Sequence, residues 1–178
     1  MKYIYMMLFA IILNSSEAQS RPYTFAIIDN NVKFEIGYSI SDSYKDIKYF
    51  SDGEKANFMN KSKNEVVTLD FCCGGNGEIQ KILLANANSI SKESLINNTN
   101  IKNFNLNSGI KLGAKKNEIL NKFGNPDEIK TNNNETIFLY ITDKNNSFLK
   151  KYNMPFYYEK YVFKNDILII CEFGFDYP

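Results

Sequence analysis

The side chains of this 178-residue chain that could do chemistry are cysteines and carboxylates, because the sequence contains no histidine. Without an imidazole the chain cannot assemble a Ser–His or Cys–His nucleophile, a histidine general base or a histidine metal site. The glycine-rich residues 74–77 lack the Lys-Ser/Thr pair that follows in a phosphate-binding loop, and their spacing differs from a dinucleotide fingerprint. We therefore predict no cofactor and no metal, and we interpret these glycines as the turn of a β-hairpin.

The three cysteines allow one disulfide. Cys72 and Cys73 are adjacent on a predicted strand, so their side chains should point to opposite faces. Cys73 falls on the apolar face of its strand, and Cys171 falls on an apolar face of residues 167–173. Because the N-terminus indicates export, we predict a Cys73–Cys171 disulfide, with two buried apolar thiols as the alternative. Cys72 is left over, and a thiol-dependent enzyme or redox protein using Cys72 and Cys73 stays an alternative, although the pair is not a C-x-x-C motif.

The carboxylates show no arrangement typical of catalysis. Asp127 and Glu128 follow Pro126 directly, and Asp70 lies across a predicted hairpin from Glu78. Nothing in this spacing holds two acids around a common pocket, as a pair of catalytic carboxylates requires. We interpret them as solvated surface acids and predict that the protein is not an enzyme.

Residues 1–18 have the features of a secretory signal peptide. A lysine precedes the apolar residues 4–13, and the small residues Ser16 and Ala18 stand at the third and first positions before a cleavage point. The ten-residue apolar run is too short to span a bilayer. We predict a chain exported to the periplasm or secreted, with no stable membrane span and with an uncleaved anchor as the alternative.

The composition suits a small globular protein. The formal net charge is +1, 44% of the residues are hydrophobic and 15% are aromatic, which is enough for a core. A nearly neutral chain lacks the basic surface that nucleic-acid binding requires. The length suits one domain or two small units. We predict a β-rich unit over residues 19–100 and a helix-plus-antiparallel-sheet unit over residues 101–178, which can form one compact domain.

Two β-hairpins are predicted in the first half of the chain. Residues 32–40 and 65–73 alternate with period two, and residues 23–28 and 78–86 are interpreted as their partner strands. Short helices are predicted over residues 43–50 and 89–96. The polar residues 52–64 are predicted to form a loop.

A short amphipathic helix is predicted over residues 115–123. Ile119 and Phe123 are four residues apart on one face, Gly124 can close the helix, and Pro126 cannot continue it. Strand-like runs follow at residues 136–142, 155–164 and 167–173, with the polar residues 143–153 between the first two. We predict an α+β fold, a small antiparallel sheet with short helices packed on one face, with two tandem helix-plus-sheet units as an open alternative.

The segment around this helix resembles a known family. The matching residues are Gly109, Leu112, Gly113, Glu118, Ile119, Leu120, Phe123, Gly124, Pro126 and Asp127. This pattern, followed by aromatic strands, is similar to the outer-membrane-assembly lipoprotein module (the SmpA/OmlA or BamE type) and to the related β-lactamase-inhibitor-protein-like fold. The resemblance covers residues 104–175. It implies an exported α+β binding module without an active site, in which the matching residues have structural roles.

Three features depart from the family pattern. Lys115 stands where the family has a Ser or Thr helix cap, the chain has no tryptophan, and no cysteine follows the N-terminal apolar run as a lipid anchor. The role in outer-membrane assembly therefore does not transfer with the fold.

The C-terminal third is rich in tyrosine and phenylalanine. A strand of a small two-layer domain cannot bury both its faces, so some of these rings should be exposed, where tyrosine is a favoured contact residue. We predict Tyr157, Tyr158 and Tyr161 as a protein-contact face, with core packing as the alternative. The expected function is that of a non-enzymatic protein-binding module, alternatively a periplasmic immunity or inhibitor protein that neutralises a secreted enzyme or toxin. The sequence identifies neither the partner nor the oligomeric state.

Overall fold

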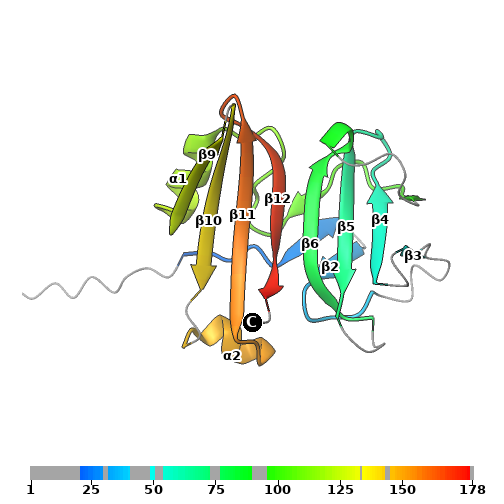
Figure 1. Cartoon of the computed structure of the whole chain (residues 1–178). Helices are drawn as coiled ribbons and strands as arrows, with labels where there is room; N and C mark the ends of the chain where they lie inside the picture. Colours follow the sequence, from blue (N-terminus) through cyan, green and yellow to red (C-terminus); the bar gives the residue numbers. More distant parts are fainter. Residues whose placement is uncertain are drawn as a thin grey trace, which may run out of the picture.

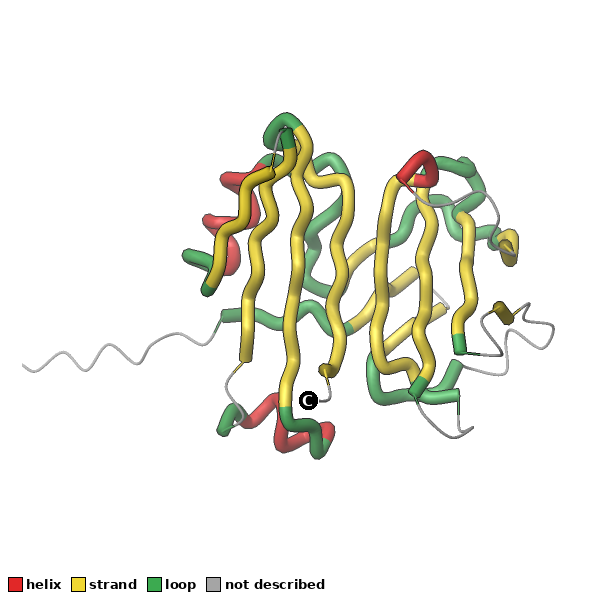
Figure 2. The backbone as a smooth tube through the Cα atoms, viewed as in Figure 1, coloured by secondary structure: helices red, strands yellow, loops and turns green. Residues whose placement is uncertain are grey.

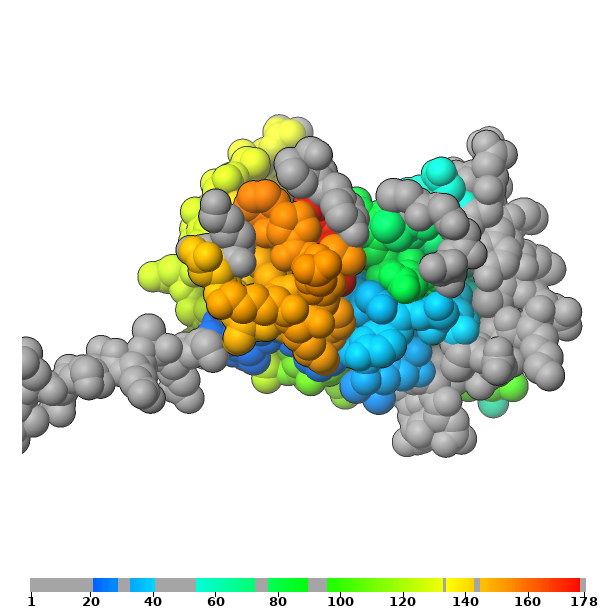
Figure 3. All heavy atoms as spheres, turned by 90° about the horizontal axis from the view of Figure 1, so that it is seen from below, coloured from blue at the N-terminus to red at the C-terminus, as the bar shows by residue number. Residues whose placement is uncertain are grey.

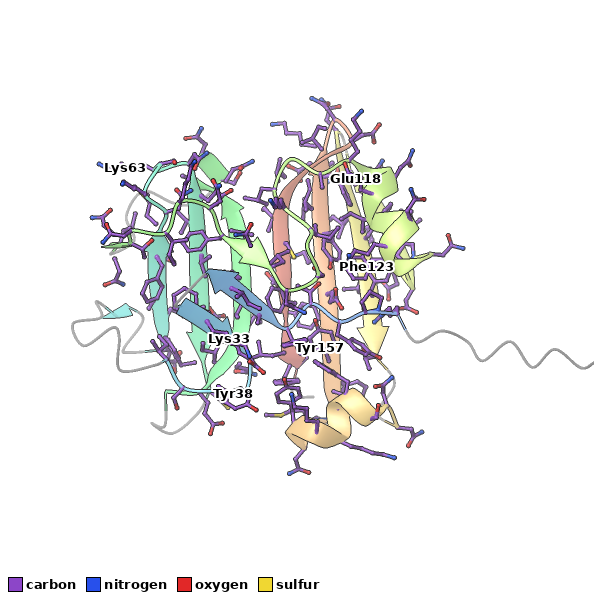
Figure 4. All side chains as sticks on the ribbon, turned by 180° about the vertical axis from the view of Figure 1, so that it is seen from behind. Lys33, Tyr38, Lys63, Glu118, Phe123 and Tyr157 are labelled. Atoms are coloured by element: carbon purple, nitrogen blue, oxygen red, sulfur yellow. The ribbon has the colours of Figure 1, made fainter. Side chains whose placement is uncertain are left out.

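A computed structural model describes residues 21–29, 32–40, 49–50, 54–72, 77–89, 96–132, 134–142 and 145–176. These residues form mainly β-structure arranged in two sheets, one of nine strands and one of three (Figure 1). The smaller sheet and the helix α1 (Lys116–Phe123) lie against the same face of the larger sheet (Figure 4). The core lies between these two layers.

The large sheet joins strands from both halves of the chain. Its strand order is β3 (Tyr49–Phe50), β4 (Lys55–Met59), β5 (Glu65–Phe71), β6 (Ile79–Asn86), β12 (Ile167–Asp176), β11 (Phe156–Lys164), β10 (Glu135–Thr142) and β9 (Glu128–Asn132). A ninth strand, β7 (Ile96–Asn98), pairs in parallel with β4. Each half contributes an antiparallel meander, and the two meanders meet where β6 pairs with β12 in an antiparallel ladder.

The small sheet covers part of the core. It consists of β2 (Val32–Glu35), β1 (Ala26–Asp29) and β8 (Asn105–Leu106), in that order. Ile27, Phe34 and Leu106 are buried, and the Phe34 ring lies 4.9 Å from the ring of Phe58 in the large sheet. The predicted hairpin at the start of the chain is therefore confirmed, because β1 and β2 pair antiparallel.

The helix α1 begins and ends as its sequence predicts. The Lys115 backbone N–H donates to the Glu118 carboxylate at 2.9 Å, which is one half of a capping box, while the N-cap residue itself makes no side-chain cap. Gly124 has a φ of 76°, and its N–H donates to the Leu120 carbonyl. Phe123 is buried against the large sheet, so α1 docks by one apolar face.

A second helix, α2 (Ser147–Tyr152), closes the lower end of the core. The Asn146 side chain accepts from the Phe148 backbone N–H at 2.8 Å, which caps the helix start. Seen from below, α2 lies beside the segment that follows β2 (Figure 3). A Cβ at Gly37 of that segment would lie only 2.8 Å from the Tyr152 ring, so glycine allows this close approach.

The prediction of an α+β fold is wrong. It expected a small sheet with short helices packed on one face, or two tandem units of that kind. The two α-helices contain only eight and six residues, and both halves share one continuous sheet. β8, from residues 101–178, also pairs with β1, from residues 19–100. The two predicted units therefore share both sheets.

Several polar segments form strands that the sequence pattern did not indicate. β4 lies within the predicted loop 52–64 and needs only Ala56 and Phe58 as inward-facing apolar residues. Tyr49–Phe50 and Ile96–Asn98 are strands, while residues 43–48 and 90–95 of the predicted helices lie outside the described residues. β9 has five exposed side chains, and α2 lies within the polar residues 143–153. The hairpin β5–β6 and the strands β10 to β12 are confirmed.

The predicted signal peptide lies outside the described residues, which begin at Arg21. Within the part of the chain that the structure describes, no helix is both long enough and apolar enough to cross a membrane.

Gly174 is expected to be essential to the junction between β6 and β12. An added Cβ would lie 2.6 Å from the Gln80 carbonyl oxygen and 2.8 Å from the Lys81 Cα, and backbone atoms cannot rotate away. Gly174→Ala should lower the free energy of unfolding by about 3 kcal/mol, the upper range for overpacking. Urea denaturation followed by circular dichroism measures this loss.

Gly113→Ala is the control for this measurement. Gly113 has a φ of 87° and nothing within 4 Å of an added Cβ, so only backbone strain of about 1–2 kcal/mol is expected. A Gly174→Ala variant as stable as the wild type would contradict the tight junction.

Candidate functional site

One face of the large sheet is uncovered by the described helices and strands. Figures 1 and 2 view the molecule from this face, with the small sheet and α1 behind. Strand register places one row of residues across it, from β4 to β10. The row comprises Lys55, Asp70, Lys81, Gly174, Tyr158 and Ile141. We call this the open face.

An apolar corner of the open face forms a pocket of about 480 Å³. Its side chains come from β10, β11 and the end of β12, and we call them the Tyr158 patch: Leu139, Ile141, Phe156, Tyr158 and Asp176. Ile141 is 41% exposed and Phe156 is 40% exposed, which is unusual for large apolar side chains on one surface. Tyr157 also borders the pocket, but its side chain points to the covered face, so only its main chain contributes.

Tyr158 is held in place at the edge of this patch. Its hydroxyl donates to the Glu172 carboxylate at 2.7 Å, and the Lys81 ammonium lies 5.9 Å from the ring centre. Burial and the hydrogen bond to Glu172 raise the pKa of the Tyr158 hydroxyl well above its ordinary value. The hydroxyl therefore stays protonated and serves as a donor, not as a base.

Charged side chains of both signs lie beside this corner, while Val66, Ala85 and Val162, farther along the same face, are buried. Lys55 forms an ion pair with Asp70 at 3.0 Å, and Lys81 stands opposite Asp70 on the next strand. Lys160 stands opposite Glu172 in the same way. An apolar pocket beside a polar, charged surface has the anatomy of a protein–protein contact site.

Of the three predicted contact tyrosines, only Tyr158 is on the open face. Tyr157 and Tyr161 are fully buried, which corrects their predicted exposure. The Tyr157 ring packs against Phe148, and the Tyr161 ring packs against Phe123. Residues 157 and 158 are adjacent on a strand, so their side chains must point to opposite faces of the sheet. This alternation alone could have shown, from the sequence, that the two tyrosines do not share one contact face.

Burial of Glu159 creates a polar cluster inside the core. Its carboxylate accepts from the Tyr161 hydroxyl at 2.6 Å and from the Thr24 backbone N–H at 3.2 Å. The Tyr157 hydroxyl donates to the Thr24 carbonyl, so the cluster ties the start of the described chain to β11. Burial raises the pKa of Glu159 above its ordinary value of 4.5, while the hydrogen bonds and the Arg21 charge oppose the shift.

Arg21 anchors the same segment from the other side. Its guanidinium donates to the Thr142 hydroxyl at 3.1 Å and pairs with Asp127 at 3.3 Å. It also lies over the Tyr140 ring at 5.1 Å, a cation–π contact. With Tyr23 stacked on Phe148 at 4.4 Å, these contacts make residues 21–25 part of the fold.

The residues of the family-like motif have structural positions. Gly113 donates its N–H to the Leu168 carbonyl at 2.9 Å, which fastens the segment before α1 to β12. Gly109 has a φ of 78° in a turn, and Leu112 packs against the core. The carbonyl of Gly124 accepts from the Tyr140 hydroxyl at 3.0 Å, just before the chain turns at Pro126 into β9. Ile119 lies in the core with Phe123.

The predicted disulfide is not formed in the structure. Cys171 is fully buried and its thiol is free, while Cys73 lies outside the described residues. Burial raises the pKa of the Cys171 thiol well above its ordinary value, so this sulfur is a poor nucleophile. Cys72 is half-buried at the end of β5.

The described residues contain no group of three or more Cys, Asp or Glu side chains that could hold a metal ion. Within the described residues, fold and surface define a two-sheet β-protein in which no described helix or strand covers one face of the large sheet. The chain matches no family model, no curated protein and no solved structure. The resemblance to the assembly lipoproteins and inhibitors stays a prediction.

Glu159 should make stability depend on pH. The folded protein holds this proton more tightly than the unfolded chain, so its contribution is complete below about pH 4.5 and is lost as pH rises through the raised folded pKa. In that window the wild type should lose up to about 1.4 kcal/mol per pH unit relative to Glu159→Gln. Denaturant titrations of both proteins from pH 4 to pH 8 test this, and parallel curves would contradict it.

Proposed function

We propose that this chain is an exported, non-enzymatic protein-binding module whose partner contacts the Tyr158 patch. The observation that carries the proposal is the exposure of Ile141 and Phe156 around one pocket of the open face. Such a patch costs solvation free energy when it is left uncovered, and a partner removes this cost.

The side chains of the Tyr158 patch suit recognition of another protein. Tyrosine supplies a large, rigid contact surface with a polar tip, and here Glu172 fixes the ring orientation before binding. Phe156 and Ile141 supply apolar area, and Asp176 adds a charge at the rim. This chemistry favours a partner that inserts an apolar side chain into the pocket.

Two features support a non-enzymatic role. Titratable groups at or beside the patch include Tyr158, Glu172, Asp176 and Lys81, and the Glu172 carboxylate already accepts a hydrogen bond from the Tyr158 hydroxyl. Cys171, the sulfur in the core, is buried and has a raised pKa. The described part of the patch therefore offers a contact surface and no nucleophile with a neighbouring base.

Export to the periplasm or the cell exterior is part of the proposal. Cleavage after residue 18 would remove the predicted signal peptide and leave every described residue in place. Arg21 and Thr24, which bind Asp127 and Glu159, would be kept.

Tyr158→Ala should weaken partner binding by about 30-fold, the effect of losing about 2 kcal/mol at a contact hot spot. Tyr38→Ala is the matched control, because Tyr38 is 50% exposed, does not line the pocket and has its ring 6.3 Å from that of Tyr152 on α2. Circular dichroism establishes that both variants fold, and surface plasmon resonance with the captured partner measures affinity. Equal affinity of both variants would count against the patch.

The partner is identified by cross-linking the full chain in its own cells. A photo-reactive amino acid at position 156 should capture a protein that the same amino acid at position 38 does not capture. Capture of a secreted enzyme or toxin at position 156 would narrow the function to an inhibitor or immunity protein. Identical capture patterns from both positions would contradict the proposal.

A further inference from the structure

We propose that β9 is a self-association edge, through which two copies of this chain pair antiparallel about a twofold axis at Ile129. The surface is separate from the Tyr158 patch, so this inference goes beyond the proposed function. It depends on three properties of β9: its free edge, its exposed isoleucine and its self-complementary charges.

β9 (Glu128–Asn132) is the last strand of the large sheet at the β10 end (Figure 1). Among the described strands it pairs only with β10, along one side. Half of its backbone N–H and C=O groups therefore point outward, where another strand can receive their hydrogen bonds. At five residues β9 is longer than β3, the two-residue strand at the opposite end of this order.

The side chains of β9 favour a partner strand. Ile129 is 59% exposed, the largest exposure among the large hydrophobic side chains of the described residues. Glu128 and Lys130 lie on the other face of the strand and form an ion pair at 2.9 Å. A lone lysine protects an edge strand from pairing, but this lysine already has an acidic neighbour.

Only one register of two paired β9 strands places Ile129 opposite an apolar residue and both charged residues opposite a residue of the other sign. If Ile129 faces Ile129 of the second copy, each Glu128 faces a Lys130 of the other copy, and both charge pairs are attractive. A register centred on Glu128 or on Lys130 instead places like charges directly opposite each other. The sequence of β9 is therefore complementary to itself about Ile129.

The twofold axis of this register is perpendicular to the sheet. Directly opposed residues in an antiparallel pair lie on the same face, and a residue can oppose itself only about such an axis. The two large sheets then form one continuous sheet, with both open faces on the same side. Because β9 has only five residues, the dimer should be weak and depend on concentration.

Charge reversal provides the test. In Glu128→Lys the dimer has lysines opposite lysines, and in Lys130→Glu it has glutamates opposite glutamates. Each single variant should dimerise about tenfold more weakly than the wild type in sedimentation equilibrium at low salt. An equimolar mixture of the two variants should form a heterodimer, because each lysine then faces a glutamate. The double variant should regain homodimerisation for the same reason.

Lys102→Glu is the control, because it makes the same charge change at an exposed position outside β9. This variant should dimerise like the wild type. A wild type that stays monomeric at about 1 mM, or a dimer unaffected by either β9 reversal, would overturn the proposal. So would single variants that dimerise weakly but fail to associate when mixed. Cross-linking from position 156 reports on the Tyr158 patch separately.

Discussion

The antiparallel ladder between β6 and β12 is the contact on which the rest of the structure depends. It joins two meanders that are far apart in the sequence through five residue pairs, from Ile170 with Ala85 to Gly174 with Lys81. On the covered face this ladder brings Cys171 beside Leu84 and Phe173 beside Ile82, so the core continues across the junction. On the open face it brings Lys81 within reach of Tyr158. Core and site therefore both depend on the same short ladder.

Local patterns predicted the parts of this fold that depend on neighbours in the sequence. Alternation of apolar and polar residues indicated the hairpins β1–β2 and β5–β6, and glycine followed by proline indicated the end of α1. Strands stabilised mainly by their partners were missed. β9 has no buried side chain and β4 has only a short apolar pattern, so backbone pairing with a neighbouring strand decides their conformation. The order of strands, which brings β6 beside β12, has no signal in local periodicity.

Burial of Glu159 shows why the candidate site was only partly predicted. Period two places Glu159 on the same face as Tyr157 and Tyr161, yet a carboxylate is normally assigned to the solvent side. Here the hydroxyl of Tyr161, two residues along the strand, and the backbone N–H of Thr24, far away in the sequence, satisfy it. With Glu159 pointing inward, the two tyrosines point inward as well. Tyr158 is left on the open face, so one buried acid decides which aromatic ring can contact a partner.

The distribution of charge favours contact at one corner of the open face. The described elements that cover the core lie on the opposite side, so the exposed part of this face contacts water when no partner is bound. On β4, β5 and β6 the charged side chains of Lys55, Asp70 and Lys81 keep this surface hydrated, and opposite charges face each other on neighbouring strands. On β10 the residues of this face that line the pocket, Leu139 and Ile141, are apolar, and they form the surface beside Tyr158. Since desolvating paired charges is costly and covering apolar side chains is favourable, a partner gains most free energy at the β10–β11 corner.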